Sequence, residues 1–546
     1  MGRKQYFWVL LRNRTFIQRR VLFGSGVLLL ATLMSTVRGA RVEAMPAPQT
    51  DKPDATLEKR IQELIPKLDA YVASGMKAFD VPGVAIGIVS GDKLVYSKGW
   101  GGRRKGGAPV DTKTVFGIGS TTKAFLATTI AIAVDHGKLH WDDRVVDLDP
   151  DFQLKDPWVT REFRVFDLVA QRSGMPPYAN DMMGILGYDE NAMVRSLRYV
   201  EPVSSFRSTF AYTNITHIVA GRIVAKAEGA ADWNAVCREE LADPLGMKDT
   251  SYTADAIKAA PNHAEGHRYT PQGSVEIPFD QFFPYNFGGA GDMNSSVEDM
   301  AHWVRLQLGN GSFEGRKIVS PENLAFTLIP KVGMSAKVAY ALGWVIMQTP
   351  NGNIVWHNGG TSGIGAFVGL QLDKHFGVII LTNQGNVGFP DALGLWIFDR
   401  LLGNPQVDHV GETLKHATAK FADDDKMFAK PVDVKSSLVL TPLTGSFANP
   451  SFGKASLKHD GDSLVLALSS GAQFKLEPWD GDVFTARILS GGRFTSVAEN
   501  MGPRPSGFVQ FQMDKEGKLN VLRLSFDDGQ AYEFRREVES TATAAR

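Results

Sequence analysis

Apolar residues recur at helical spacing over residues 56–79, and this pattern ends at a Val-Pro-Gly sequence. The apolar positions are Leu57, Ile61, Leu64, Ile65, Leu68 and Val72. Two strand-like runs follow, at residues 83–90 and 92–101, and they meet at Ser90-Gly91. Short β-type runs joined by a glycine turn are typical of a β-hairpin. The sequence therefore predicts a long helix followed by two antiparallel strands.

Several helical patterns occupy the next part of the chain. From Leu342 onward the strand signal returns in four runs: LGWVIMQ, NIVWH, GAFVGLQL and GVIILTN. A helix over residues 391–402 ends this region. Strands from both ends of the region would form one sheet around a helical middle, so we expect an α+β fold.

The pattern changes after residue 403. Residues 404–435 are polar and charged, which predicts a linker. From residue 436 to 538, short alternating runs are separated by Gly and Asp, with turns about every 8–12 residues. This spacing indicates a small β-barrel or sandwich, whose inward faces could line a cavity.

The N-terminal segment has the layout of an export signal. Six basic residues and no acidic residue lie within residues 3–20, and 17 uncharged residues follow at 21–37. That run is shorter than the roughly 20 residues of a membrane span, and small residues stand at the −3 and −1 positions before a cut at Ala44. We expect residues 1–44 to direct export to the periplasm or beyond, with a disordered lead at 45–55. Arg19-Arg20 would also suit a twin-arginine route, and an uncleaved membrane anchor is the alternative.

Composition narrows the classes of function. The chain has 546 residues, 43% hydrophobic and 22% charged, which excludes a multi-span membrane protein and a wholly disordered one. Lys and Arg number 59, as do Asp and Glu, so no bulk basicity favours nucleic acid. Cys237 is the single cysteine, which excludes a disulfide framework and a multi-cysteine metal site. We expect no cofactor and no metal ion.

A Ser-x-x-Lys spacing places an amine beside a hydroxyl on one face of a helix, and serine needs such a base to act as a nucleophile. The spacing occurs four times, at Ser74/Lys77, Ser90/Lys93, Ser120/Lys123 and Ser451/Lys454. Only Ser120 opens a strongly apolar helix, AFLATTIAIAV after Lys123, which Gly137 ends. Burial would lower the pKa of Lys123, and the helix N-terminus would favour an alkoxide at Ser120. The alternative is a helix-capping serine with an incidental lysine.

A second group must carry the proton to the leaving group. Tyr-x-Asn occurs at Tyr178-Ala179-Asn180 and at Tyr212-Thr213-Asn214, and the second leads into a helical run. A nearby ammonium would lower the phenol pKa of Tyr212 from its reference value of about 10. Asn214 could orient Lys123 or the substrate amide. A buried tyrosine with a satisfied hydroxyl is the alternative.

The third element is the sequence Trp356-His357-Asn358-Gly359-Gly360-Thr361-Ser362-Gly363, which joins two strand-like runs. Glycines at a strand end allow a substrate backbone to approach closely. A backbone amide there could face the Ser120 amide and form an oxyanion hole, in which one donor contributes about 3 kcal/mol. Alone, His357 would equally fit a structural histidine.

The three motifs together resemble those of the serine β-lactamase-like hydrolases, which include class C β-lactamases, D-Ala-D-Ala carboxypeptidases, esterases and CubicO-type peptidases. The resemblance runs from about Thr56 to Leu402. It rests on FGIGSTTK (116–123), Ser173-Gly174, FAYTN (210–214), GGAGDMNSSVEDMA (288–301), LGW (342–344) and HNGGTSGI (357–364). It implies a β-lactamase/transpeptidase-like sheet flanked by helices, with a helical subdomain, over residues 56–403.

The resemblance also implies roles for individual residues. Ser120 would be acylated, Lys123 would be its base and Tyr212 the proton relay, while amides of Ser120 and Gly360 would hold the oxyanion. The implied catalytic residues are Ser120, Lys123, Tyr212 and His357. The implied substrate-binding residues are Asn214, Gly359, Gly360 and Thr361.

One departure from the family pattern concerns charge. β-Lactamases and many penicillin-binding proteins carry Lys-Thr-Gly where this chain has His357-Asn358-Gly359. A histidine titrates near pH 6.5 and would hold a positive charge only partly at neutral pH. Histidine at this position looks more like the esterases and peptidases. We therefore expect a limb in the pH–rate profile near the pKa of His357.

The C-terminal region, from Leu438 to Arg535, resembles the lipocalin-like domain that follows the catalytic domain in some of these peptidases. In those proteins it can cap the active site or mediate oligomers, so the resemblance implies either role here, a cap over the site or a homo-oligomer through this domain.

The leading expectation is an exported serine hydrolase that cleaves small peptides, either peptidoglycan-derived, D-amino-acid-containing, or linear products of opened cyclic peptides. A carboxylesterase or weak β-lactamase on the same scaffold is the alternative within this class. Another class is a sensor protein that is acylated without turnover. A metallohydrolase using His263 and His267 is disfavoured, because Pro261 and Gly266 do not suit the zinc-binding helix that the spacing would need.

Overall fold

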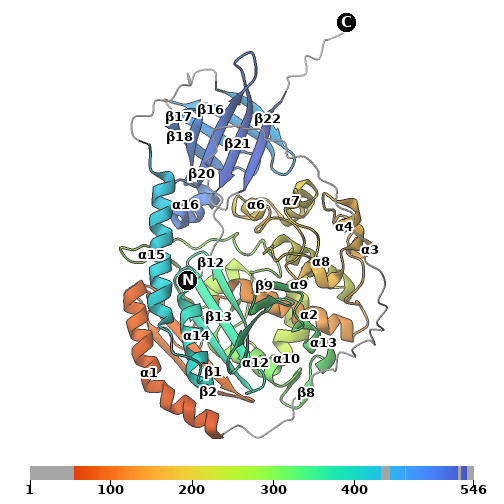
Figure 1. Cartoon of the computed structure of the whole chain (residues 1–546), viewed down its shortest axis with the longest axis vertical. Helices are drawn as coiled ribbons and strands as arrows, with labels where there is room; N and C mark the ends of the chain where they lie inside the picture. The colour runs from red at the N-terminus through yellow and green to blue at the C-terminus, as the bar shows by residue number, and fades with distance from the viewer. Residues whose placement is uncertain (1–54, 432–442, 462, 527–529, 538–546) are drawn as a thin grey trace, which may run out of the picture. The chain divides into compact units, whose positions relative to one another are not determined.

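The computed structural model describes residues 55–431, 443–461, 463–526 and 530–537 (Figure 1). The expected export signal (1–44) and all but the last residue of the expected lead (45–55) lie outside these residues. Among the residues that the structure describes, no helix is both long enough and apolar enough to cross a membrane.

The first region is built on an eight-stranded antiparallel sheet with the order β2-β1-β14-β13-β12-β11-β10-β9. The strands β1 and β2 form the predicted hairpin, and β1 pairs on its other edge with β14. Both ends of the region therefore contribute to one sheet, as the sequence predicts. The strand bounds are β1 Gly83–Ser90, β2 Lys93–Gly101, β9 Val332–Ser335, β10 Val338–Tyr340, β11 Val345–Thr349, β12 Gly352–Thr361, β13 Ile364–Gln371 and β14 Phe376–Thr382.

Helices cover both faces of this sheet (Figure 1). On one face lie α1 (Ala55–Phe79) and α14 (Phe389–Leu402), whose apolar residues form one buried cluster with β1 and β14. The predicted apolar stripe of α1 is buried at Leu57, Ile61, Leu64, Leu68 and Val72. On the other face α12 (Val297–Leu308) contacts β1 and β14. Burial of apolar faces on both sides of the sheet supplies the main favourable free energy of folding.

The helical middle is organised around α2 (Thr122–Asp135), which packs against α8 (Ile215–Glu228). Every residue of α2 from Thr122 to Ala133 is buried, as its uncharged sequence predicts. Gly137 adopts a left-handed backbone (φ +68°) and its N–H bonds to the Val134 carbonyl, which ends the helix.

Shorter elements complete this region. The helices are α3 Val145–Leu148, α4 Pro157–Glu162, α5 Val165–Leu168, α6 Asp181–Ile185, α7 Glu190–Ser196, α9 Trp233–Cys237, α10 Asp243–Leu245, α11 Ala254–Ala259 and α13 Pro321–Thr327. Single turns are η1 Gly119–Thr121, η2 Leu197–Tyr199 and η3 Arg238–Ala242. Two-residue strands pair as β3 Phe116–Gly117 with β6 Asn294–Ser295, β4 His267–Arg268 with β5 Val275–Glu276, and β7 Ser312–Phe313 with β8 Arg316–Lys317.

The interval 404–435, expected to be a linker, contains the 20-residue helix α15 (His409–Phe428). This helix contacts α14 and α1, and its first residue donates from His409 Nε2 to Asp399 Oδ2 at 2.7 Å. Val410 is its one buried residue. The connection is therefore helical, and its sequence gave little apolar signal because the helix buries so little.

The C-terminal region is a closed antiparallel barrel of eight strands. Pairing of β15 with β22, at Phe447 with Arg536 and Ala448 with Arg535, closes it. Inward side chains such as Phe474, Leu466 and Phe511 are buried and pack in one cluster. The strands are β15 Gly445–Asn449, β16 Gly453–Asp460, β17 Ser463–Leu468, β18 Gln473–Asp480, β19 Val483–Ile488, β20 Gly507–Met513, β21 Leu519–Phe526 and β22 Ala531–Arg536, with η4 Gly492–Phe494 and α16 Thr495–Met501 between β19 and β20.

Candidate active site

Ser120 and Lys123 meet at the start of the buried helix α2. Ser120 lies in η1, directly before α2, and its side chain is partly accessible. The Lys123 side chain is completely buried, and its Nζ atom lies 3.0 Å from Ser120 Oγ and 2.7 Å from the Ala290 carbonyl oxygen. The amine and the hydroxyl therefore share one face of the helix start, as the Ser-x-x-Lys spacing predicts.

Burial changes the acid–base chemistry of Lys123. Loss of solvation lowers its pKa from 10.5 to about 7, and the charges of Asp181 and Asp292 partly oppose this shift. About half of the lysine is consequently a neutral amine at neutral pH. A neutral amine in hydrogen-bond contact with a serine hydroxyl can accept its proton.

Asp292 is a buried carboxyl group that sequence reasoning assigned no role, although it lies in the quoted segment 288–301. Its Oδ2 accepts from Trp233 Nε1 at 2.9 Å and its Oδ1 accepts from the Gly289 N–H at 3.0 Å. Burial raises its pKa to about 7. These bonds fix the turn that presents the Ala290 carbonyl to Lys123. Asp292 can be recognised only once the fold is known, because its burial, its hydrogen bonds and its closeness to Lys123 are features of the structure.

Tyr212 also contacts the serine. Its hydroxyl is hydrogen-bonded to Ser120, and Lys123 Nζ lies 4.9 Å from the centre of its ring. We expected a neighbouring ammonium to lower the Tyr212 pKa, and that expectation is wrong. Burial raises the pKa well above 10, with Tyr340 adding to the rise, so Tyr212 is a neutral phenol that can donate a proton.

Asn214 occupies the start of α8, half-buried. Its Nδ2 donates to Asp181 Oδ2 at 2.6 Å. Asp181 in turn is the largest charge that raises the Lys123 pKa. Asn214 therefore holds a carboxylate whose charge acts on Lys123, while its expected role toward the substrate amide stays a prediction.

His357 is buried and neutral, contrary to the expectation that it would titrate near pH 6.5. Burial and the neighbouring Lys123 lower its pKa to about 3. Its Nδ1 lies 2.6 Å from the Asn358 carbonyl oxygen, which can only accept, so Nδ1 carries the proton. Its Nε2, 3.1 Å from the Tyr340 hydroxyl, then accepts from Tyr340. A charge at His357 thus contributes nothing to the site at neutral pH.

The end of β12 presents glycine backbone directly to Ser120. A Cβ atom on Gly359 would lie 2.0 Å from the Ile118 carbonyl oxygen and 3.2 Å from the Ser120 nitrogen. A Cβ on Gly119, which has φ +52°, would lie 2.6 Å from the Gly360 nitrogen. Only glycine fits these contacts, which place the backbone amide of Gly360 close to that of Ser120.

The strand β12 keeps one edge available beside these glycines. Residues 357–361 pair with β13, whereas pairing with β11 ends at Val345 and Trp356. Within the described ranges, no strand pairs with the other edge of 357–361. Asn386 Nδ2 donates to the Gly359 carbonyl oxygen at 3.0 Å, and Asn358 donates to the buried Asp391 at 2.6 Å. Thr361 completes the strand and lies against Gly117.

The other Tyr-x-Asn copy also lies at the site, which the sequence did not indicate. The Tyr178 ring is half-exposed and its centre lies 5.5 Å from that of Tyr212. The Tyr178 N–H bonds the Tyr212 carbonyl oxygen at 2.6 Å. Tyr178 has a left-handed backbone (φ +56°), an uncommon conformation for a bulky residue that often marks a functional loop.

The two histidines considered for a metal site, His263 and His267, each contact a different group. His263 Nε2 lies 3.3 Å from Glu265, while the buried His267 bonds the Asn383 carbonyl oxygen at 2.9 Å through Nδ1. Among the described residues, no group of three or more His, Cys, Asp or Glu side chains is arranged to hold a metal ion.

Comparison with known proteins agrees with this geometry. A family model described as "Beta-lactamase" matches residues 68–399, well over half of the chain. A second model, "Domain of unknown function (DUF3471)", matches residues 429–539, which include the barrel.

Three curated proteins are similar to this chain. "Unguisins hydrolase ungD'" of Aspergillus campestris is 29% identical over 57% of this chain and 60% of its own length. "Unguisins hydrolase ungD" of Aspergillus violaceofuscus is 26% identical over 80% of this chain and 85% of its own length. "Protein flp" of Staphylococcus aureus (strain COL) is 26% identical over 59% of this chain and 64% of its own length.

Among solved structures, the octameric penicillin-binding protein homologue from Pyrococcus abyssi matches with a TM-score of 0.55 and 22% identity. The match covers 86% of this chain and all of that one, and at this identity it shows the fold alone. With the family model spanning the sheet, the helical middle and all three motifs, the chain belongs to the β-lactamase family of serine hydrolases.

Proposed function

We propose that the protein is an exported peptidase that cleaves small linear or D-amino-acid-containing peptides through an acyl-enzyme on Ser120. The observation that carries the proposal is the 3.0 Å contact between Ser120 Oγ and the Nζ atom of a lysine whose pKa burial lowers to about 7. The two relatives named as unguisins hydrolases support a peptide substrate, because the resemblance extends over 80% of this chain in one of them.

In the acylation step, neutral Lys123 removes the Ser120 proton while Oγ forms a bond to the substrate carbonyl carbon. The carbonyl oxygen becomes an anion held by the backbone N–H groups of Ser120 and Gly360. Such preorganised donors are a large source of catalysis, about 3 kcal/mol for each.

The bond to the leaving group breaks when the nitrogen or oxygen of that group receives a proton from Tyr212. Lys123, which holds the proton taken from Ser120 and whose Nζ atom lies 4.9 Å from the centre of the Tyr212 ring, restores the proton of Tyr212. Water then attacks the acyl carbon in the reverse sequence, with Lys123 again as the base, and releases the acid product. Each proton removed is returned, so the site ends in its initial state.

An esterase is the second candidate, and the neutral His357 favours it. In family members with Lys-Thr-Gly, a permanent cation at this place suits a substrate carboxylate. Here the buried imidazole has a pKa of about 3 and offers no such charge. Substrates without a carboxylate next to the scissile bond, including esters and internal peptide bonds, fit better than β-lactams.

The test is to trap the acyl-enzyme with a serine-directed phosphonate and to map the labelled peptide by mass spectrometry. We expect a single label on Ser120. A parallel screen of linear peptides, D-amino-acid peptides and p-nitrophenyl esters should give released product with turnover numbers well above one. Stoichiometric acylation without product would instead identify a sensor protein, and a label elsewhere would remove Ser120 from the mechanism.

A further inference from the structure

Gln171 is buried beside the site, in a backbone conformation that glutamine rarely adopts. It lies three residues after α5, is 1% exposed, and has φ +55°. Left-handed backbone at a buried residue other than glycine persists only where the surrounding structure enforces it, and it is concentrated at functional sites.

The contacts of Gln171 fall on the two residues that flank Tyr212. Its main-chain oxygen accepts from the Ala211 N–H at 2.9 Å. Its side-chain Oε1 accepts from the Thr213 N–H at 2.6 Å and from the Thr213 hydroxyl at 3.1 Å. One residue therefore holds the backbone immediately before and immediately after the tyrosine. The left-handed φ directs its main-chain and side-chain oxygens to the same segment.

The Gln171 side chain also lies beside the Tyr340 hydroxyl. Tyr340 is fully buried and donates to His357 Nε2 across 3.1 Å. Gln171 thus lies between the segment that carries Tyr212 and the tyrosine that fixes His357.

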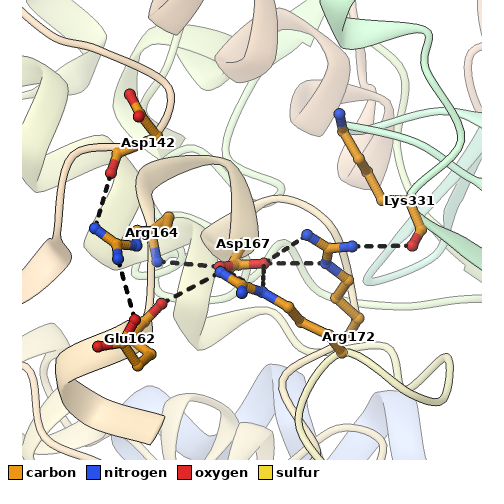
Figure 2. A network of polar contacts seen from close by, with 7 residues as sticks. Asp142, Glu162, Arg164, Asp167, Arg172 and Lys331 are labelled. Carbon is orange, nitrogen blue, oxygen red and sulfur yellow. Dashed lines mark hydrogen bonds and ion pairs between the residues drawn. The ribbon is translucent and has the colours of Figure 1, made fainter. Parts of the chain in front are cut away.

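An ion-pair network centred on the buried Asp167 secures the loop on either side of these contacts (Figure 2). The Asp167 carboxylate, which has no exposed surface, bonds Arg172 at 2.9 Å and Arg207 at 2.5 Å. Arg172 also donates to the Lys331 carbonyl oxygen at 3.1 Å, as Figure 2 shows. Its own carbonyl oxygen accepts from the Arg207 N–H at 2.8 Å.

This network joins three segments that are far apart in the sequence: 167–172, 207–213 and 331–340. The last is included because the Lys331 N–H bonds the Tyr340 carbonyl oxygen at 2.8 Å. Since the buried Asp167 carboxylate is matched by both arginines, which also bond backbone carbonyl oxygens, the segments have little freedom to move separately.

We propose that Gln171 is a positioning residue that holds the Tyr212 hydroxyl against Ser120 by clamping the backbone on both sides of the tyrosine. The proposal rests on the proposed function, in which Tyr212 passes the proton to the leaving group. Gln171 itself touches no reacting atom. Its effect on the reaction is therefore expressed through Tyr212, and this dependence can be measured.

The test uses Gln171→Asn in the full chain, with ethyl butyrate as substrate and a fluorophosphonate to count active sites. The ethoxide leaving group of this ester needs the proton that Tyr212 supplies. Asparagine tolerates left-handed backbone and keeps the main-chain bond to Ala211, but it is one methylene too short to reach Thr213. We expect the acylation rate per active site to fall about 10- to 100-fold, because a displacement near 1 Å costs that much, with KM changed less than about twofold.

The decisive measurement is a double-mutant cycle with Tyr212→Phe. If Gln171 acts through Tyr212, then Gln171→Asn slows the Tyr212→Phe enzyme by less than about twofold, since the group it positions is already absent. An equal loss in both backgrounds would overturn the proposal. So would a single Gln171→Asn variant within twofold of the wild-type rate.

Gln307→Asn is the matched control. Gln307 is also buried, 3% exposed, and its Nε2 donates to Thr128 at 3.2 Å inside the helical region, away from Tyr212. This variant should keep its rate per active site. If Gln171→Asn does not fold, Gln171→Gly replaces it, because glycine adopts the left-handed backbone without strain and also lacks the side-chain clamp. A wild-type chain that neither hydrolyses the ester nor takes the label at Ser120 would overturn the proposed function and this inference together. An active wild type with an unaffected Gln171 variant would overturn this inference alone.

Discussion

The Nζ atom of Lys123 lies 3.0 Å from the Oγ atom of Ser120 while the lysine side chain is completely buried. The contact alone would leave an ammonium, which cannot accept a proton. Burial makes it productive by lowering the Lys123 pKa to about 7, and Asp181 and Asp292 keep it from falling further. Position and protonation state are therefore set by the same apolar helix, α2.

Replacing Ser120 with alanine should abolish turnover with little change in fold. Removal of a catalytic nucleophile typically lowers kcat on the order of 10³–10⁶-fold. The measurement is the steady-state rate of ester and peptide hydrolysis, together with phosphonate labelling, which should disappear. Retention of more than a tenth of the wild-type rate would refute the role of Ser120.

The acid limb of the pH–rate profile should belong to Lys123. Below its pKa of about 7 the lysine is protonated and cannot take the serine proton, so the acylation rate should fall about tenfold for each pH unit. Rates of p-nitrophenyl acetate acylation between pH 5 and 9 measure this directly. A flat profile over that range would contradict a lysine base.

Motif order and helix context were sufficient to select Ser120/Lys123 from four Ser-x-x-Lys copies. The reason is physical: a long uncharged run fixes a buried helix, and a buried helix fixes the surroundings of the lysine at its start. The approach of a substrate backbone to the glycines of the third motif stays a prediction. In the structure Gly359 admits the chain's own backbone, at the Ile118 carbonyl oxygen and the Ser120 nitrogen.

Other features depend on tertiary burial that no local pattern records. The charge of His357 was predicted wrongly because full burial and Lys123 decide its pKa. Helix α15 resembled a linker because only Val410 is buried in it. Gln171 has no sequence signal, since its importance comes from a left-handed φ and from contacts with a segment 40 residues away.

Asp292→Asn should move the acid limb to lower pH. The Asp292 charge raises the Lys123 pKa, so its removal lets desolvation lower that pKa further. The shift is small below pH 7, because Asp292, with a pKa of about 7, is itself largely protonated there. The same substitution leaves one oxygen for two donors, the Trp233 indole N–H and the Gly289 N–H, so a lower maximal rate is also expected. The pH of half-maximal acylation, measured beside Trp233→Phe as a control for the lost bond, separates the two effects. A limb that moves to higher pH in Asp292→Asn would contradict the sign of this interaction.

His357→Gln should reduce activity without changing the position of the acid limb. The imidazole is neutral throughout the working range because its pKa is about 3, so it cannot be the source of a transition near neutrality. Glutamine is also neutral and can accept from the Tyr340 hydroxyl, so a loss of roughly 10-fold or less is expected from imperfect packing. A limb that disappears in this variant would show that His357 titrates after all.

Lys123→Met should make the protein inactive and, near neutral pH, more stable. The folded-state pKa of about 7 lies below the unfolded value near 10.5, so the unfolded chain binds the proton more strongly between these values. Wild-type stability is reduced at and below pH 7 and recovers as pH rises toward 10.5. Methionine fills similar space without this cost, which is on the order of a few kcal/mol at pH 7 before the lost bond to Ala290 is counted. Thermal unfolding at pH 7 and pH 9.5 tests the sign. The Tm advantage of the variant should be larger at pH 7 and should shrink at pH 9.5. An advantage that grows with pH would mean that Lys123 is held as an ammonium in the folded state.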